Sequence, residues 1–329
     1  MKRIILLTII MTMLGLSAHS LNPIAPPFLH AGDTIALLSP SSTPKPGVVE
    51  AGVKTLTEWG YHVVVGRHAN DAWRSFAGTH EQRLADLLAA LRNPSVKAIV
   101  CSRGGYGSAN VLALLPLDTL RRYPKWIVGY SDITGYLSAA VRAGFMGIHA
   151  NMCGRLQDTG GTDLASAYLR NLLRGKLPSY RVPAHPLNHQ GVASGIVVGG
   201  NMCVFGDLAG SPYDFLDPAF TDGRDIILFI EEVGESIARI DRLVQHLRVR
   251  GTLDKVKGVI VGRFDDCPLS RGYSSVHEMV EEYLRQYDIP VCYDFPTGHD
   301  ENWNYPLIEG CPATLRVTGE GVELTFNLP

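Results

Sequence analysis

Strands and helices alternate along the first half of the chain, and this alternation limits the possible folds more than any other feature of the sequence. Short apolar runs at 34–38, 62–65 and 98–101 end at turn residues and are separated by helix-like stretches. One of these stretches opens with Thr79 and Gln82, which have the spacing of a capping box. Because successive strand–helix–strand units close with right-handed crossovers, the pattern predicts a doubly wound α/β domain. Its sheet should be mostly parallel, and ligands should gather at the carboxyl ends of the strands.

The second half of the chain repeats the mixture of strands and helices in a different order. Its apolar runs and its final alternating hairpin predict strands at 193–198, 226–230, 258–261, 289–293, 315–317 and 322–326. A periodic apolar stretch at 237–247 predicts a helix between them. The segment 156–190 is looser and rich in turn residues, with one helix near 165–173. We therefore predict an N-terminal α/β domain at 30–155, a linker at 156–190 and a second, C-terminal α/β domain at 191–329.

The N-terminus has the composition of an export signal. Lys2 and Arg3 precede an apolar stretch at 4–16, and Ala18-His19-Ser20 provides a small-x-small cleavage site. This predicts a secretory signal peptide at 1–20, too short to span a membrane comfortably, and a mature periplasmic or secreted protein without stable membrane insertion. An uncleaved anchor is the alternative. The net charge of −2 and the absence of a basic stripe argue against a nucleic acid partner.

The cysteines and histidines show no pattern of a metal site. The six cysteines are widely spaced, and Cys101 and Cys292 lie in apolar runs, where a buried free thiol is expected. An exported protein could also form disulfides. Because neither a C-x-x-C pair nor an H-E-x-x-H helix occurs, we expect no metal and no other cofactor.

Ser131 lies where a strand turns into a helix. The apolar run 126–128 ends at Gly129, and apolar positions at helical spacing follow the serine. A serine at such a turn is exposed at the sheet edge, with the N–H groups of a helix start close behind it, which suits a nucleophile. The alternative is that Ser131 only caps the helix.

A glycine-rich segment, RGGYG at 103–107, follows the preceding strand. It lacks the third glycine of a dinucleotide-binding loop and the lysine of a P-loop, so nucleotide binding is poorly supported. The segment is either a turn that needs glycine or a loop whose N–H groups approach a substrate.

Two further polar groups follow buried strands in the second half. Glu231 and Glu232 come after the apolar run 226–230, and His299 follows a Pro- and Gly-containing turn after 289–293. Each has an ordinary interpretation, as acids near a helix start or as a surface histidine. Together with Ser131 they make a serine, a carboxylate and a histidine at strand ends, in the chain order of the α/β-hydrolases.

Five segments in order give the chain a resemblance to the LD-carboxypeptidase family of serine peptidases, which includes the microcin C immunity peptidases. The resemblance covers nearly all of the chain after Gly32. The segments are RGGYG (103–107), GYSD (129–132), GGN with GSPY (199–201 and 210–213), IEEVGE with RIDR (230–235 and 239–242), and FPTGH (295–299).

The resemblance implies a nucleophile, Ser131, a general base, His299, and an orienting carboxylate, Glu231. It also implies an active site between the two domains, an oxyanion site at the N–H groups of Gly105 and Asp132, and usually a homodimer. Arg103 is a candidate by position for binding the substrate carboxylate, although a structural salt bridge would suit it equally.

The implied activity is release of terminal D-alanine from a murein tetrapeptide, a small peptide substrate. The alternatives are a peptidase of the microcin C immunity type, acting on a peptidyl-nucleotide or a related small amide, and an exported binding protein without enzymatic activity. Two segments depart from the family pattern: His149-Ala150-Asn151 replaces His-Gly-Pro, and the segment after His299 is about a residue short.

Overall fold

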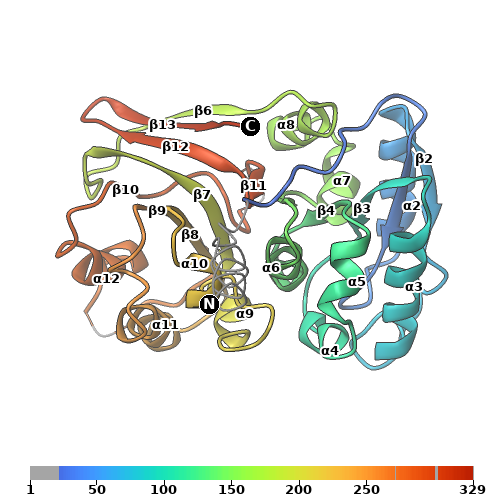
Figure 1. Cartoon of the computed structure of the whole chain (residues 1–329), viewed down its shortest axis with the longest axis horizontal. Helices are drawn as coiled ribbons and strands as arrows, with labels where there is room; N and C mark the ends of the chain where they lie inside the picture. The colour runs from blue at the N-terminus through green and yellow to red at the C-terminus, as the bar shows by residue number, and fades with distance from the viewer. Residues whose placement is uncertain (1–21, 271, 301–302, 329) are drawn as a thin grey trace, which may run out of the picture.

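The computed structural model describes residues 22–270, 272–300 and 303–328 and contains two β-sheets lying side by side (Figure 1). The expected signal peptide at 1–20 lies outside the described residues. Within the described chain, no helix combines the length and apolar character needed to cross a membrane. All six cysteines are free thiols, and Cys101 and Cys292 are buried as expected.

The N-terminal sheet has six strands in the order β11-β5-β4-β3-β1-β2. Five of them are parallel, and β11 is antiparallel to β5. The strands are β1 (Thr34–Leu38), β2 (His62–Val65), β3 (Val96–Cys101), β4 (Trp126–Gly129), β5 (Gly147–His149) and β11 (Leu307–Glu309). The predicted mostly parallel sheet is confirmed, but β11 comes from the C-terminal half of the sequence.

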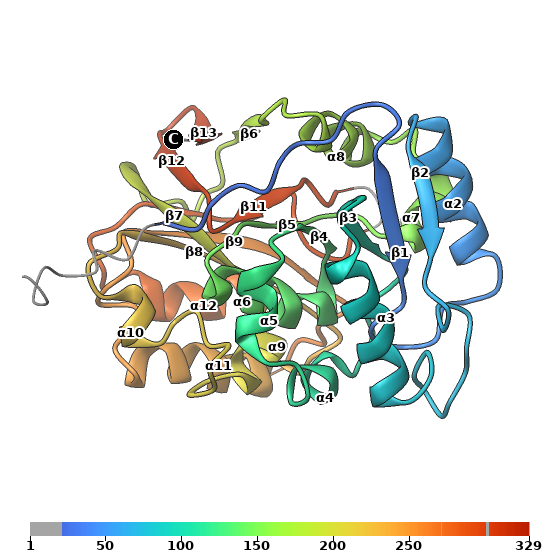
Figure 2. The same cartoon turned by 45° about the vertical axis from the view of Figure 1, so that its right-hand side comes forward.

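Helices cover both faces of this sheet because alternate residues of each strand point in opposite directions. Ile35 and Leu37 join one buried cluster with the helices α2 and α7, whereas Ala36 and Leu38 join another with α3 to α6 (Figure 2). The helices are α2 (Val48–Glu58), α3 (His80–Arg92), α4 (Ser108–Leu112), α5 (Leu117–Arg122), α6 (Thr134–Ala143), α7 (Cys153–Thr159) and α8 (Leu164–Leu173). Thr79 and Gln82 form the predicted capping box of α3.

The C-terminal sheet has seven strands in the order β10-β9-β8-β7-β12-β13-β6 and is mixed. β7 to β10 are parallel, while β12, β13 and β6 extend the sheet in antiparallel fashion. The strands are β6 (Ser179–Pro183), β7 (Gly191–Asn201), β8 (Ile226–Val233), β9 (Gly258–Asp265), β10 (Val291–Cys292), β12 (Pro312–Val317) and β13 (Gly321–Phe326). The helices of this half are α9 (Met202–Asp207), α10 (Pro218–Thr221), α11 (Ile237–Val249) and α12 (Val276–Leu284).

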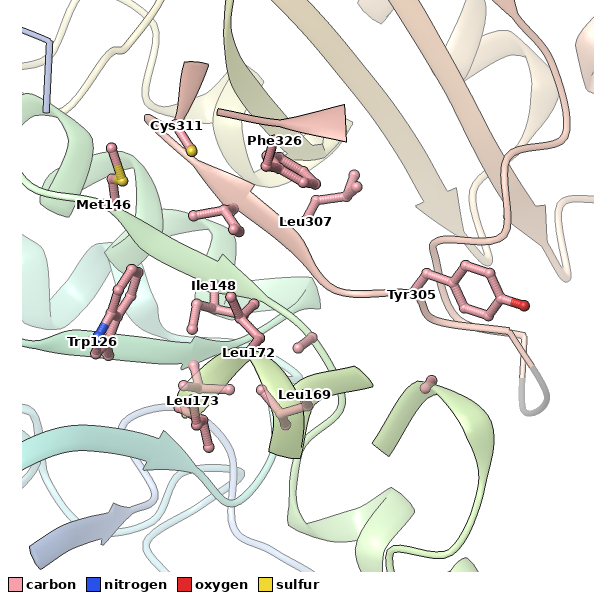
Figure 3. Close-up of a cluster of buried hydrophobic side chains, with 14 of the residues drawn as sticks. Trp126, Met146, Ile148, Leu169, Leu172, Leu173, Tyr305, Leu307, Cys311 and Phe326 are labelled. Carbon is pink, nitrogen blue, oxygen red and sulfur yellow. The ribbon is translucent and has the colours of Figure 1, made fainter. Parts of the chain in front are cut away.

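One buried cluster joins the two halves. Ile148 from β5 and Leu169 from α8 belong to the same cluster as Leu307 from β11 and Phe326 from β13 (Figure 3). The segment 156–190, which the sequence predicted as a linker, therefore contributes to the core through α8. It also supplies β6, which pairs with β13 at the edge of the C-terminal sheet. No strong sequence pattern predicts this strand, because it lies at the edge of the sheet and only one of its five residues, Tyr180, is buried.

Candidate active site

Ser131 lies on a strained turn directly after β4. Its backbone φ is +63°, in the left-handed region that a residue with a side chain adopts only when its surroundings impose it. A short 3-10 turn at Ser131–Ile133 leads into α6, and neither helix start has a side-chain capping hydrogen bond. The alternative that Ser131 caps the helix is therefore not supported. The turn leaves the hydroxyl at the sheet edge, as a nucleophile requires.

The glycine loop after β3 lies directly against this turn. A Cβ on Gly104 would lie 2.9 Å from the Cβ of Ser131 and 3.1 Å from the backbone nitrogen of Asp132, so no larger residue fits without a shift. Gly105 has φ +99°, which favours glycine. Among the described residues, the N–H groups of Gly105 and Asp132 have no hydrogen-bond acceptor. Both are therefore free to bind a developing oxyanion beside Ser131.

The carboxylate of Asp132 fixes the position of this turn. It accepts hydrogen bonds from the backbone N–H of Ser108 at 2.8 Å and from the Ser108 hydroxyl at 2.9 Å. The hydroxyl of Ser41, after β1, donates a third at 2.5 Å. Because Asp132 is buried, these bonds compensate for its lost hydration and tie together the ends of three segments of the N-terminal half.

Glu231 and Glu232 point to opposite faces of β8, as strand alternation predicts. Glu231 is fully buried and accepts a hydrogen bond from His299 Nδ1 at 2.8 Å. Glu232 instead accepts from the side-chain amide of Asn201 at 2.6 Å and from the backbone N–H of Cys203 at 2.9 Å. The strand continues to Val233, so both carboxylates belong to β8 rather than to a helix start.

His299 is held in a loop that packs against Tyr130. Its backbone N–H donates to Asp265 at 2.9 Å, and its ring centroid lies 4.9 Å from that of Tyr130, the residue before Ser131. Burial lowers the pKa of His299, but the charge and hydrogen bond of Glu231, together with the charges of Asp265 and Glu232, outweigh this effect and raise the pKa above its usual value. His299 Nε2 has no hydrogen-bond partner among the described residues. The structure therefore joins His299 to Glu231 and places both beside the Ser131 turn, without a bond between His299 and Ser131.

Two cavities flank the Tyr130–Ser131 step. His299 and Arg103 line one of about 340 Å³, and Ser131 lines the other, of about 290 Å³, together with Gly105 and Asp132. Arg103 donates to the backbone carbonyl of Thr43 at 3.2 Å. In the part of the chain that the structure describes, no carboxylate pairs with Arg103, so the salt-bridge alternative is not supported.

Two cations that sequence reasoning missed line the same cavity as Arg103 and His299. Lys45 reaches it from the loop before α2, and Arg155 reaches it from α7. No motif marks either residue, because neither lies at a strand end. Together with Arg103 they give the cavity three positively charged groups, opposed by Asp158 and Asp300.

The motifs at 199–201 and 210–213 hold the two halves together next to this site. The backbone N–H of Asn201 donates to the Thr134 hydroxyl at 3.1 Å, and a Cβ on Gly200 would come within 2.5 Å of that hydroxyl oxygen. Arg142 donates to the carbonyl of Pro212 at 3.1 Å, and the hydroxyl of Tyr213 donates to that of Leu112 at 2.8 Å. These contacts fix β7 against the start of α6, which follows the Ser131 turn.

A strained serine after a parallel strand, free N–H groups beside it and a carboxylate–histidine pair opposite it are typical of the serine hydrolases. Within that class, this chain belongs to the LD-carboxypeptidase family. The profile of the LD-carboxypeptidase N-terminal domain matches residues 35–150, and that of the LD-carboxypeptidase C-terminal domain matches residues 194–315. Family members are serine hydrolases, so the alternative of a binding protein without enzymatic activity is set aside.

Individual relatives agree with this assignment. The murein tetrapeptide carboxypeptidase of Pseudomonas aeruginosa is 31% identical over 286 residues, covering 82% of this chain and 90% of the relative. The microcin C7 self-immunity protein MccF of Escherichia coli is 28% identical over 327 residues, covering 84% and 89%. The crystal structure of muramoyltetrapeptide carboxypeptidase from Oxalobacter formigenes superposes with a TM-score of 0.79 at 25% identity, covering 89% of this chain and 98% of that one.

Proposed function

We propose that this protein is a serine carboxypeptidase that releases terminal D-alanine from murein tetrapeptides. The observation that carries the proposal is the 2.8 Å hydrogen bond between Glu231 and His299 Nδ1, beside the strained Ser131 turn. This bond leaves His299 Nε2 as the nitrogen that can accept a proton from a serine. The murein peptide specificity comes from the relatives, one of which is a murein tetrapeptide carboxypeptidase.

The proposed reaction proceeds through an acyl-enzyme. His299 Nε2 takes the proton of the Ser131 hydroxyl as its oxygen attacks the carbonyl carbon of the amide. The resulting oxyanion accepts hydrogen bonds from Gly105 and Asp132, and loss of one such donor typically costs about 100- to 1,000-fold in rate. The amide C–N bond then breaks, and D-alanine leaves with the proton from His299. Water hydrolyses the ester in the same way and regenerates Ser131.

In this proposal, Arg103 binds the C-terminal carboxylate of the substrate, so the substrate must have a free C-terminus. Its guanidinium lines the cavity that also contains His299, and within the described residues no carboxylate forms an ion pair with it. An unpaired guanidinium can bind a terminal carboxylate through two hydrogen bonds. Lys45 and Arg155 add positive charge to the same cavity.

A peptidyl-nucleotide is the second candidate substrate, because three cations in one cavity would also suit a phosphate. The same assay separates the two candidates. The mature protein is incubated with the free tetrapeptide, the C-terminally amidated tetrapeptide, the pentapeptide and a peptidyl-nucleotide, and products are identified by mass spectrometry. We expect D-alanine from the free tetrapeptide alone.

A folded Ser131→Ala variant is the matched control for this assay and should lose about four to six powers of ten in rate. Equal hydrolysis of the amidated peptide would show that no carboxylate is recognised. Cleavage of the peptidyl-nucleotide without release from the tetrapeptide would transfer the assignment to the second candidate. Turnover by Ser131→Ala at the wild-type rate would remove the serine mechanism.

Export and dimer formation belong to the same proposal. An exported enzyme would meet murein peptides where they are released, and the predicted signal peptide supports this location. The family resemblance supports a homodimer, which light scattering of the purified mature protein would distinguish from a monomer.

A further inference from the structure

A layer of buried polar atoms without hydrogen-bond partners lies behind the Glu231–His299 pair. Among the described residues, these unpartnered atoms include Glu231 Oε1, both ring nitrogens of His149 and the side-chain nitrogen of Asn304. Glu231, His149 and Asn304 are all nearly or fully inaccessible to solvent, at 0%, 0% and 3% exposure. A buried polar atom left without a partner costs about 1–3 kcal/mol, so three such residues together call for an explanation.

The topology brings His149 against the base of the pair. His149 ends β5 and aligns with Gly129 of β4, two residues before Ser131. Its ring lies 5.0 Å from that of Phe229, which is two residues before Glu231 and therefore on the same face of β8. The ring of Tyr130 lies 5.9 Å from the ring of His149 and 4.9 Å from that of His299.

Asn304 connects the same layer to the loop that carries His299. Its side-chain oxygen accepts hydrogen bonds from the Thr297 hydroxyl and from the backbone N–H of Gly298, both at 3.3 Å. Asn304 also lies three residues before Leu307, which pairs with His149 in the sheet. Its amide nitrogen, with two N–H donors, has no acceptor within hydrogen-bond distance among the described residues. The Asn304 side chain lies beside the His149 ring and contributes to the pKa of that ring.

The donors and acceptors of this layer are complementary. Burial lowers the pKa of His149 to about 4, although the charge of Glu231 and the adjacent side-chain amide of Asn304 oppose the shift, so the ring is neutral near pH 7. A neutral imidazole has one N–H donor and one acceptor nitrogen, and the Asn304 amide adds donors. Glu231 Oε1 is an acceptor without a donor among the described residues, because the hydrogen bond from His299 Nδ1 is accepted by the other carboxylate oxygen.

We propose that His149 is a positioning residue for the reaction: together with Asn304 it holds the free oxygen of Glu231 through a buried water. This fixes the carboxylate so that its second oxygen stays on His299 Nδ1, and it rests on the function proposed above. A water with two to four polar partners is the usual solution for such a group of buried atoms. The neutral ring is essential, because a second positive charge here would compete with His299 for the carboxylate.

Two variants separate positioning from packing. His149→Phe keeps a ring of similar size but removes both nitrogens, whereas His149→Gln keeps a donor and an acceptor. We expect His149→Phe to lower kcat by about tenfold to a hundredfold with little change in KM, the usual cost of removing a residue that orients a functional group of the site. The pKa of His299, measured by NMR titration of its ring, should fall in the same variant. His149→Gln should recover most of both losses.

A role in packing alone predicts the opposite result. If His149→Phe retained the wild-type kcat and the wild-type pKa of His299, the proposal would be wrong. The NMR titration needs no substrate, so it decides the role of His149 even if the murein assay fails for the wild-type protein.

A high-resolution crystal structure of the wild-type protein provides a test that needs no variant to fold. We expect a water within about 2.6–3.2 Å of Glu231 Oε1 and of a His149 nitrogen or the Asn304 amide. An ordered site without that water would overturn the proposal.

Discussion

At the scale of single residues, the two adjacent glutamates of β8 show how strand geometry separates chemical roles. Glu231 is bonded to His299, while Glu232 is bonded to Asn201 and to the backbone of Cys203. The two carboxylates are adjacent in sequence but have no hydrogen-bond partner in common. Glu231 can orient a base, whereas Glu232 connects β8 to the start of α9.

Exchange of each glutamate for glutamine should therefore have unequal effects on activity. Glu231→Gln should lower kcat by about 10⁴-fold, because the neutral amide neither fixes the tautomer of His299 nor stabilises its imidazolium. Glu232→Gln is the matched control and should cost far less, since it leaves His299 untouched. Steady-state rates of the two folded variants test this, and the reverse order would move the orienting role to Glu232.

The pH dependence should follow the raised pKa of His299. A general base acts only when neutral, so kcat/KM should fall as the pH falls through this pKa, with a midpoint above the ordinary value of about 6.5. Because Glu231 makes the largest contribution to the rise, Glu231→Gln should move the midpoint to lower pH, and Glu232→Gln should move it much less. A wild-type midpoint at or below about 6.5 would contradict the raised pKa, and an unchanged midpoint in Glu231→Gln would show that Glu231 does not stabilise the protonated histidine.

At the scale of secondary structure, β11 is the element that most constrains how the two halves meet. It comes from the C-terminal half of the sequence but pairs with β5 at the edge of the N-terminal sheet. The backbone N–H of Gly310, directly after it, donates to Val197 of β7 at 2.7 Å, so this short segment contacts both sheets. Its last residue, Glu309, is fully buried, and within the described residues neither of its carboxyl oxygens has a hydrogen-bond partner.

Glu309 should make the folded protein less stable as the pH rises. Burial raises its pKa well above the ordinary value, and the nearby N–H of Gly199 offsets only part of this rise. The folded state therefore keeps the proton that the unfolded chain loses above about pH 4.5. The contribution of Glu309 to the free energy of unfolding should therefore fall as the pH rises, by at most about 1.4 kcal/mol per pH unit.

Glu309→Gln should remove this pH dependence. In urea unfolding, the free energy of unfolding of the variant should exceed that of the wild type by more at pH 8 than at pH 5. The control is Glu323→Gln on β13, where a partly exposed carboxylate pairs with the exposed Arg181 at 3.4 Å and should contribute little at either pH. Equal effects of Glu309→Gln at both pH values would mean that Glu309 ionises normally in the folded state.

At the scale of the whole molecule, residues of both sheets belong to one buried core. Trp126, Leu172 and Leu315 belong to the same buried cluster although they come from β4, α8 and β12. Asn201 and Tyr213 add hydrogen bonds between the halves close to the Ser131 turn. The candidate site depends on this shared core, because Ser131 comes from one half and Glu231 and His299 from the other.

The mature protein should begin near Leu21, outside the cytoplasmic membrane. Lys2, Arg3, the apolar stretch at 4–16 and the small-residue site at 18–20 motivate this expectation. N-terminal sequencing of the protein recovered from the producing cell measures it directly. Soluble cytoplasmic protein that retains Met1 would contradict export.

Much of the fold could be predicted from the sequence because the responsible interactions are local. The apolar run of β4, the turn at Gly129 and the periodic residues of α6 define strand, turn and helix within about twenty residues. Thr79 and Gln82 define a helix start within four. The alternation that sends Glu231 and Glu232 to opposite faces is likewise a property of any strand.

Only the tertiary structure decided which of these segments meet. The bond between Glu231 and His299 spans 68 residues of sequence, and β11 pairs with a strand formed about 160 residues earlier in the chain. No local sequence pattern predicts the cavity that Lys45 and Arg155 share with His299. Residue patterns record burial and local hydrogen bonding, whereas partners distant in sequence depend on how the two sheets pack against each other.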